Sequence, residues 1–158
     1  MSLEPTTPQA AALWARFKAT SAGVEDSRLY EVFAFGDSER LANDLAALVL
    51  SGAKRATTSS MWTCEAEGRR PPKPGDFSIV TDGVGTPLCV IETMQVDVMP
   101  FEDVSAEFAA AEGEGDGSLA YWREAHTAFF GRECARIGRS VDGSMRVVCE
   151  RFKVVLRA

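Results

Sequence analysis

The sequence predicts an α+β domain in which an antiparallel sheet curls into a small β-barrel with flanking helices. The first observation is the order of the elements: helix, strand, helix, several strands, two helices and a long final strand. Grouped strands followed by grouped helices are typical of α+β folds. The second is size, because 158 residues with 46% hydrophobic content can bury one core and form a single domain.

The first third of the chain contains two helices and one strand. Apolar residues recur on one face of a predicted helix over 8–22, which Gly23 ends. The alternating stretch 30–35 predicts a strand. Asp37 is expected to cap a second helix with an apolar stripe, and Gly52 is expected to end that helix in a left-handed conformation.

A hairpin follows, formed by residues 76–81 and 87–98. In the second strand Glu92 falls in phase with the apolar residues, where a carboxylate is costly unless it is paired or hydrogen-bonded. Glu92 is therefore either a structural acid held by an arginine or backbone donor, or an acid that faces an active-site cleft.

The second half predicts a short helix over 105–111, an acidic glycine-rich loop, a long helix over 118–137 and a strand over 146–156. The acidic loop lacks the bidentate acid that a calcium loop needs at its twelfth position, so no metal is expected there. On the long helix His126 lies among aromatic residues, as a structural residue or a functional one.

Cysteine usage and hydropathy exclude several classes of protein. With no C-x-x-C pair and a single histidine, a zinc site is not expected. Signatures for dinucleotide-binding proteins, P-loop proteins, serine hydrolases and zinc proteases are absent, and no cofactor is expected. No apolar run reaches about 18 residues, so a soluble cytoplasmic protein without a membrane span is expected.

The net charge of −6 conceals a segregation of charge along the chain. Residues 54–73 carry five bases and two acids, residues 102–116 carry six acids and no base, and residues 132–158 carry seven bases and three acids. The acidic average argues against nucleic-acid binding through basicity alone. These segments either line a cleft for an anionic ligand with a carboxylate inside it, or form solvated surface.

The stretch 52–59 places two cations and three hydroxyls directly after a predicted helix end. A threonine hydroxyl becomes a nucleophile when a neighbouring amine removes its proton, so Lys54 and Thr57 can act as base and nucleophile. The same stretch can also form a phosphate cradle. In a plain strand the two side chains would point to opposite faces, so they can meet only across a turn or bulge, which Gly52 permits.

Several ordered segments carry a family resemblance: Phe35-Gly36-Asp37, Leu48 to Ser59, Pro74-Gly75-Asp76, Glu112 to Leu119, and Trp122 with His126. Over residues 30–156 they resemble the bacterial ASCH domain family. The resemblance implies a PUA-like fold, a small β-barrel with flanking helices, in residues 30–158. Residues 1–29 would then form a helical extension packed on it. It also implies an association with RNA or a modified nucleoside.

Some members of that family are similar to amidohydrolases that deacetylate N4-acetylcytidine with a Lys-x-x-Thr pair and a glutamate. On that resemblance Lys54 is the base, Thr57 the nucleophile and Glu112 the acid. The residues expected to bind substrate or RNA are Arg55, Thr58, Ser59, Trp62, Glu92, Glu114, Trp122 and His126.

This chemistry requires Lys54 to be a neutral amine. Burial or the neighbouring Arg55 is expected to lower its pKa, while Glu112 would raise it. We therefore expect Glu112 to orient the pair or to pass a proton to the leaving amine. We also expect Glu112→Gln to reduce turnover and leave the fold intact.

Two other functions stay open at this point. Another member of the family is described as a ribonuclease, and a metal-independent or metal-assisted ribonuclease would depend largely on His126. The second alternative is an RNA-binding module without chemistry. It would use Lys54, Arg55, Arg69 and Arg70 on phosphates, and Trp62 or Trp122 to stack on a base.

Overall fold

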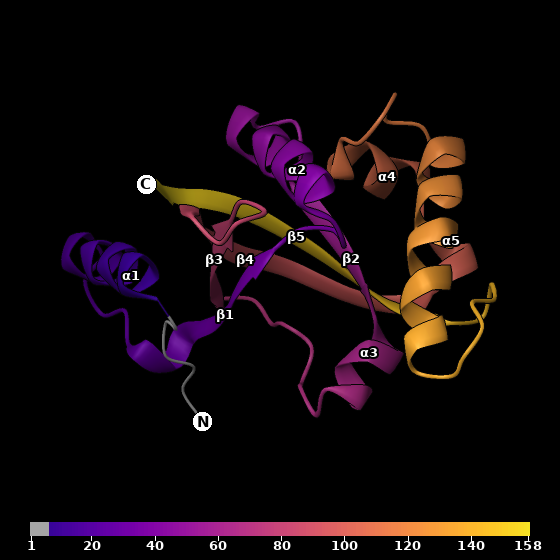
Figure 1. Cartoon of the computed structure of the whole chain (residues 1–158), viewed down its shortest axis with the longest axis horizontal. Coiled ribbons are helices and arrows are strands. Elements are labelled where there is room, and N and C mark those ends of the chain that lie inside the picture. Colours follow the sequence, from indigo (N-terminus) through magenta and orange to yellow (C-terminus); the bar gives the residue numbers. More distant parts are fainter. Residues whose placement is uncertain (1–6) are drawn as a thin grey trace.

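The computed structural model describes residues 7–158, which form one five-stranded sheet with helices around it (Figure 1). The strands are β1 (Leu29–Ala34), β2 (Ala56–Ser60), β3 (Phe77–Thr81), β4 (Pro87–Pro100) and β5 (Arg146–Arg157). The α-helices are α1 (Pro8–Thr20), α2 (Glu39–Ser51), α3 (Met61–Ala66), α4 (Ala106–Glu112) and α5 (Leu119–Arg136). Single 3-10 turns, η1 (Asp26–Arg28) and η2 (Phe101–Asp103), precede β1 and α4.

The strand order is β1-β3-β4-β5-β2, with β1 parallel to β3 and every other pair antiparallel. The two edge strands, β1 and β2, do not pair within residues 7–158, so the curled sheet is open along the gap between them. The α+β class with a curled sheet is confirmed, but the sheet is mixed. The reason is connectivity, because the chain passes through α2, β2 and α3 before β3, and such a long crossover allows a parallel neighbour.

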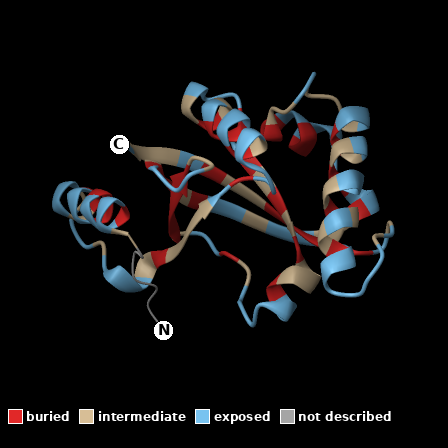
Figure 2. Cartoon of the chain, viewed as in Figure 1, coloured by how far each residue is buried: buried red, intermediate tan, exposed pale blue. Residues whose placement is uncertain are grey.

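The N-terminal helix and the long α5 lie at opposite ends of the molecule (Figure 1). Trp14 and Phe17 of α1 pack on Phe77 of β3, with ring centroids 6.2 and 4.8 Å away. Figure 2 shows the inner side of α1 buried and its outer side exposed. Burial of a large apolar side chain contributes about 1.5–3 kcal/mol, so these rings fix α1 on the sheet. The division into an extension, 1–29, and a domain, 30–158, stays a prediction.

The start of α2 differs from the prediction at one residue. Ser38 caps the helix, because its hydroxyl accepts a hydrogen bond from the backbone N–H of Leu41 at 3.1 Å. Asp37 instead binds the guanidinium of Arg132 on α5. Both short polar side chains can cap a helix, and a contact with a distant arginine decides between them. Gly52 ends α2 as predicted, with a φ of 85°.

The later elements lie close to their predicted ranges. The hairpin is β3 and β4, the helices that follow Ser105 and Ser118 are α4 and α5, and the final strand is β5. No sequence pattern predicted α3, which Ser60 caps by accepting a hydrogen bond from the backbone N–H of Trp62. Across residues 7–158, every helix is too short or too polar to span a bilayer.

Candidate functional site

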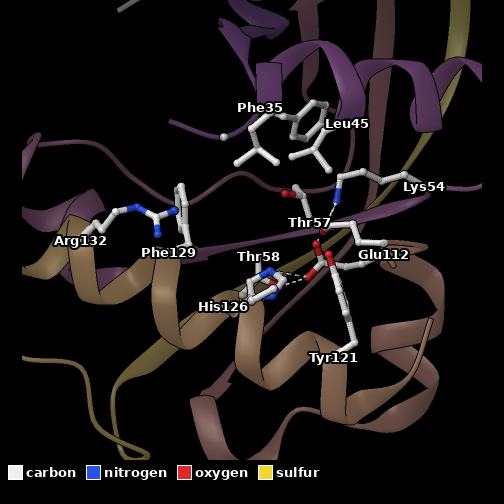
Figure 3. Close-up of a pocket in the computed structure, with 14 residues that line it drawn as sticks. Phe35, Leu45, Lys54, Thr57, Thr58, Glu112, Tyr121, His126, Phe129 and Arg132 are labelled. Atoms are coloured by element: carbon white, nitrogen blue, oxygen red, sulfur yellow. Dashed lines mark hydrogen bonds and ion pairs between the residues drawn. The ribbon is translucent and has the colours of Figure 1, made fainter. Parts of the chain in front are cut away.

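A cavity of about 220 Å³ opens where the turn after β1, the start of β2, the loop after α4 and one face of α5 meet. We call it the first cavity. Side chains from these separate elements point into it (Figure 3). Six of its polar lining residues are among the predicted site residues: Lys54, Thr57, Thr58, Glu112, Glu114 and His126. The structure therefore brings together all three predicted catalytic residues and three of the predicted binding residues.

Lys54 enters the first cavity from the short connection between α2 and β2. After the left-handed Gly52, the backbone N–H of Lys54 donates to the carbonyl of Leu48 at 3.1 Å. The backbone N–H of Arg55 donates to the carbonyl of Ala111 at 2.8 Å, which joins this connection to the end of α4. Lys54 is only 2% exposed. This connection is the turn before β2 that the sequence predicts.

The loop after α4 approaches Lys54 so closely that it requires a glycine. Gly113 has a φ of 68°, and a Cβ atom there would lie 2.0 Å from the carbonyl oxygen of Ala53. No other residue fits without displacing the backbone. This approach holds the carboxylates on either side, Glu112 and Glu114, beside the Lys54 ammonium.

Glu112 is the centre of a buried polar network. Its Oε1 accepts a hydrogen bond from Nζ of Lys54 at 2.9 Å. Its Oε2 accepts from the hydroxyl of Thr58 at 2.6 Å and from the indole N–H of Trp122 at 2.5 Å. The same oxygen lies 3.2 Å from Nε2 of His126. Four donors thus satisfy a carboxylate that is 1% exposed, which offsets the cost of its burial.

These contacts set the charge of the central pair. Burial lowers the pKa of Lys54, but the negative charges of Glu112 and Glu114 outweigh burial and raise it above its ordinary value. Burial raises the pKa of Glu112, but Lys54 and His126 hold it well below its usual range. In this structure Lys54 is therefore an ammonium. The expectation that burial or Arg55 keeps it neutral is wrong here, because two carboxylate oxygens lie within 3.1 Å.

His126 and Glu114 complete the network. Burial lowers the pKa of His126, but its hydrogen bond to Glu112 and the attraction of that carboxylate raise it overall. Nδ1 of His126 lies 2.9 Å from the carbonyl of Trp122, so both ring nitrogens are engaged. Burial raises the pKa of Glu114, with the charge of Lys54 opposing and that of Glu112 adding. Glu114 is thus the carboxylate of the network that protonates more readily.

Thr57 and Thr58 both line the first cavity although strand neighbours point to opposite faces. The cavity reaches both faces because β2 is an edge strand. The Thr58 hydroxyl is held by Glu112. Within residues 7–158 the Thr57 hydroxyl has no hydrogen-bond partner, and Glu150 of β5 lies opposite Thr57 in the ladder. Thr57 is therefore the threonine that a ligand can contact without breaking the network.

Four predicted binding residues lie elsewhere. Trp122 is buried, does not line the first cavity, and donates to Glu112. Phe101 and His126 stack on its ring, so no face is free for a base. Arg55 is exposed and does not line the cavity. Ser59 lines a second, smaller cavity. Trp62 lies on α3, where the guanidinium carbon of Arg139 lies 4.6 Å from its ring centroid.

Glu92 also lies outside the first cavity. It is half-buried, and its Oε1 lies 3.9 Å from Nζ of Lys153. The prediction assumed unbroken alternation along the strand, but β4 shifts register against β5 on either side of Glu92. Each such irregularity changes which face the following side chains occupy. This placement agrees with the structural interpretation of Glu92.

Eight further residues line the first cavity and were not predicted as site residues: Phe35, Gly36, Leu41, Leu45, Tyr121, Ala125, Phe129 and Arg132. On α5, Tyr121, Ala125 and Phe129 follow one another every four residues on the face beside His126, a spacing that could have identified them. Nε of Arg132 lies 2.7 Å from Oδ2 of Asp37, so an ion pair joins α5 to the turn after β1.

Glu112, Glu114 and His126 place three potential metal ligands within 4.8 Å of one another. The donor set does not favour a metal, because Glu112 already accepts from four donors and both ring nitrogens of His126 are engaged. A divalent ion would have to displace the Lys54 ammonium that already balances these carboxylates. The cluster is a buried network of ion pairs and hydrogen bonds around Lys54 and Glu112.

Comparison with known proteins identifies relatives of this chain. A family model described as ASCH domain matches residues 31–156. An ASCH domain structure from Lactobacillus crispatus JV V101 is 34% identical, with a TM-score of 0.89 over 99% of both chains. A protein of Enterococcus faecalis V583 is 37% identical, with a TM-score of 0.82 over 92% of this chain and 87% of that chain. No curated protein matches the chain.

Proposed function

The chain belongs to the ASCH domain family, and from that premise we propose that it hydrolyses an acyl amide on a modified pyrimidine nucleoside of the N4-acetylcytidine type. Thr57 is the nucleophile, Lys54 carries protons, and Glu112 fixes Lys54 in place. The observation that carries this proposal is that the unengaged Thr57 hydroxyl and the buried Lys54 ammonium line one cavity.

The rest of the lining suits a flat, uncharged base. In Figure 3, Phe35 and Leu45 lie above the polar network, and Phe129 lies to its left. Ligand sites commonly combine such apolar walls with a few convergent polar groups that fix orientation. Aromatic walls also stack favourably on a pyrimidine ring. The acylated nitrogen would then face Thr57 and Lys54.

The reaction proceeds in two stages. The Thr57 oxygen attacks the acyl carbon, and the negative charge that forms on the acyl oxygen is stabilised by the nearby Lys54 ammonium. The C–N bond then breaks, the amine leaves with a proton, and the acyl group stays on Thr57 as an ester. A water molecule hydrolyses that ester, which releases the carboxylic acid and restores the hydroxyl.

The raised pKa of Lys54 requires a route for its proton. Glu114 is the acceptor, because its Oε2 lies 3.1 Å from Nζ of Lys54 and its own pKa is raised by burial. Transfer of a proton to Glu114 leaves a neutral Lys54 amine. Lys54 then takes the proton of Thr57 and delivers it to the leaving nitrogen. Glu112 stays ionised and keeps Nζ in position.

The two alternatives have less support. A ribonuclease that uses His126 as acid or base needs an available ring nitrogen, and both are engaged. An RNA-binding surface needs unpaired cations. Here Arg69 binds Glu31 at 2.7 Å, Arg70 binds Asp76 at 2.8 Å, and Lys54 is buried against two carboxylates. Of the four predicted cations, only Arg55 is exposed without an ion pair within residues 7–158.

The test is incubation of the purified protein, with EDTA present, against N4-acetylcytidine and against a structured RNA. Thr57→Ala should abolish deacetylation, and His126→Ala should show whether any RNA cleavage depends on the histidine. Thr127→Ala, an exposed threonine on α5, is the matched control and should turn over like the wild type. RNA cleavage that His126→Ala removes, with no deacetylation by the wild type, would overturn the proposal.

A further inference from the structure

A second cavity, of about 110 Å³, lies along the same open gap between the edge strands. The first cavity is lined by Phe35 and Gly36, just after β1, and by the start of β2. The second is lined by Tyr30, Glu31 and Phe33 of β1 and extends to Ser59 near the end of β2. Thr57 lines both. The two cavities therefore share one lining residue, the proposed nucleophile, and the second has half the volume of the first.

Arg69 pairs with two of the three carboxylates around the second cavity. Arg69 donates to Glu31 at 2.7 Å and to Glu67 at 3.3 Å. This leaves Glu150, whose Oε2 accepts the hydroxyl of Thr93 at 2.6 Å. Its other oxygen has no hydrogen-bond partner within residues 7–158. Glu150 is the carboxylate of this cavity that a ligand can bind.

The strand register groups the remaining polar side chains. Thr57 and Glu150 are directly opposite in the β2–β5 ladder, so their side chains lie on the same face. Ser59 is two residues further along β2 and shares that face. A carboxylate and two hydroxyls thus lie together on the floor of the gap.

This lining selects a class of ligand. A phosphate is disfavoured because three glutamates line the cavity and its single arginine is already paired. An apolar group would leave a carboxylate oxygen and hydroxyls unsatisfied. A small polyhydroxylated group satisfies them, since each hydroxyl can donate to Glu150 and accept from Ser59. Burial raises the pKa of Glu150 to about 7, and both its acid and its carboxylate form can hydrogen-bond a hydroxyl.

We propose that the second cavity is a sugar subsite that binds the ribose hydroxyls of the nucleoside whose acylated base occupies the first cavity. Glu150 and Ser59 bind the hydroxyls, and Thr57 lies at the junction between base and sugar. This inference rests on the proposed function for the position of the base. It names the substrate as a nucleoside with a ribose, and it disfavours a substrate that carries a phosphate at this point.

The experiment compares N4-acetylcytidine with N4-acetylcytosine, which lacks the sugar. Hydrogen bonds to a charged group predict that the wild type prefers the nucleoside by about 10- to 100-fold in kcat/KM. Glu150→Ala should remove most of that preference and Ser59→Ala part of it. Glu124→Ala, an exposed glutamate on α5, should keep it. If the wild type and both subsite variants prefer the nucleoside over the free base by the same factor, the sugar subsite is excluded.

Binding of the reaction product separates this inference from the proposed function. If the protein deacetylates neither compound, the proposed function fails, and calorimetric titration with cytidine and with cytosine decides the subsite. Tighter binding of cytidine that Ser59→Ala and Glu150→Ala weaken supports the subsite without any turnover. Equal affinities for cytidine and cytosine, or no binding of either, would exclude it. Ser59→Ala removes one oxygen atom, which keeps the test valid if Glu150→Ala does not fold.

Discussion

Glu112 in the first cavity and Glu150 in the second are both carboxylates shielded from water, yet their surroundings give them opposite properties. Glu112 accepts from four donors, one of them the Lys54 ammonium, and its pKa is held well below its usual range. Glu150 accepts one hydroxyl, and burial raises its pKa to about 7. The number and charge of the donors, rather than burial, decides whether a buried carboxylate is a fixed charge or a group that titrates near neutral pH.

The largest expected effect comes from breaking the first of these sites. Glu112→Gln leaves the buried Lys54 ammonium without its closest counter-charge, and loss of one partner of a buried ion pair costs about 3–5 kcal/mol. We therefore expect this variant to be less stable than the wild type, in contrast to the sequence-based expectation that its fold stays intact. Urea unfolding at pH 7 measures the change. Glu107→Gln, whose side chain is 85% exposed, is the matched control and should stay within about 0.5 kcal/mol.

The pH dependence of this difference has a defined sign. A depressed folded pKa makes the ionised Glu112 stabilising above about pH 4.5, and that contribution is lost as the pH falls through the folded value. The difference in free energy of unfolding between wild type and Glu112→Gln should therefore become smaller as the pH falls. A gap that widens below pH 4.5 would contradict the assignment of Glu112 as a fixed carboxylate.

Glu150→Gln should show the opposite trend. Because the folded protein binds this proton more tightly, the stabilisation is complete below about pH 4.5 and is lost as the pH rises through about 7. Glutamine has no such loss, so between pH 5 and 8 the free energy of unfolding of the variant should rise by about 2–3 kcal/mol relative to wild type. Urea unfolding at both pH values measures it. If the difference in free energy of unfolding between wild type and variant is the same at pH 5 and pH 8, Glu150 is ionised over this whole range.

The neighbouring threonines offer a smaller test of the same contrast. Thr58 donates to the ionised Glu112, and a hydrogen bond to a charged group contributes about 1.5–3 kcal/mol, so Thr58→Val should destabilise by that amount. Thr57→Val should have little effect on unfolding but should abolish turnover. Paired thermal melts and deacetylation assays check both. Equal destabilisation by the two variants would mean that Thr57 also belongs to the network.

Local patterns were enough to predict most elements of the fold. Ser105 and Ser118 before apolar stripes marked two helix starts, and Gly52 marked a helix end, because caps depend on neighbours in sequence. The parallel pairing of β1 with β3 and the capture of Asp37 by Arg132, 95 residues away, depend on tertiary contacts that leave no local pattern.

The site divides in the same way. Lys54 and Glu112 could be named from the spacing of Lys54 and Thr57 and from the family resemblance. The charge of Lys54 could not, because it depends on Glu112 and Glu114 meeting its ammonium across the Gly113 turn. The sequence therefore named Lys54 and Glu112 as candidates, and the directions of their pKa shifts follow only from the contacts in the structure.

The smallest expected effect is at Glu92, the carboxylate that the sequence left between a structural and a catalytic role. Its contact with Lys153 is 3.9 Å long and partly exposed, and such surface pairs contribute about 0–1 kcal/mol. Glu92→Gln should therefore change the free energy of unfolding by less than about 1 kcal/mol and leave deacetylation unchanged. Urea unfolding and kcat/KM on N4-acetylcytidine check this. A loss of turnover as large as that of Thr57→Ala would place the working carboxylate on β4, and the contrast between Glu112 and Glu150 would then not describe the active site.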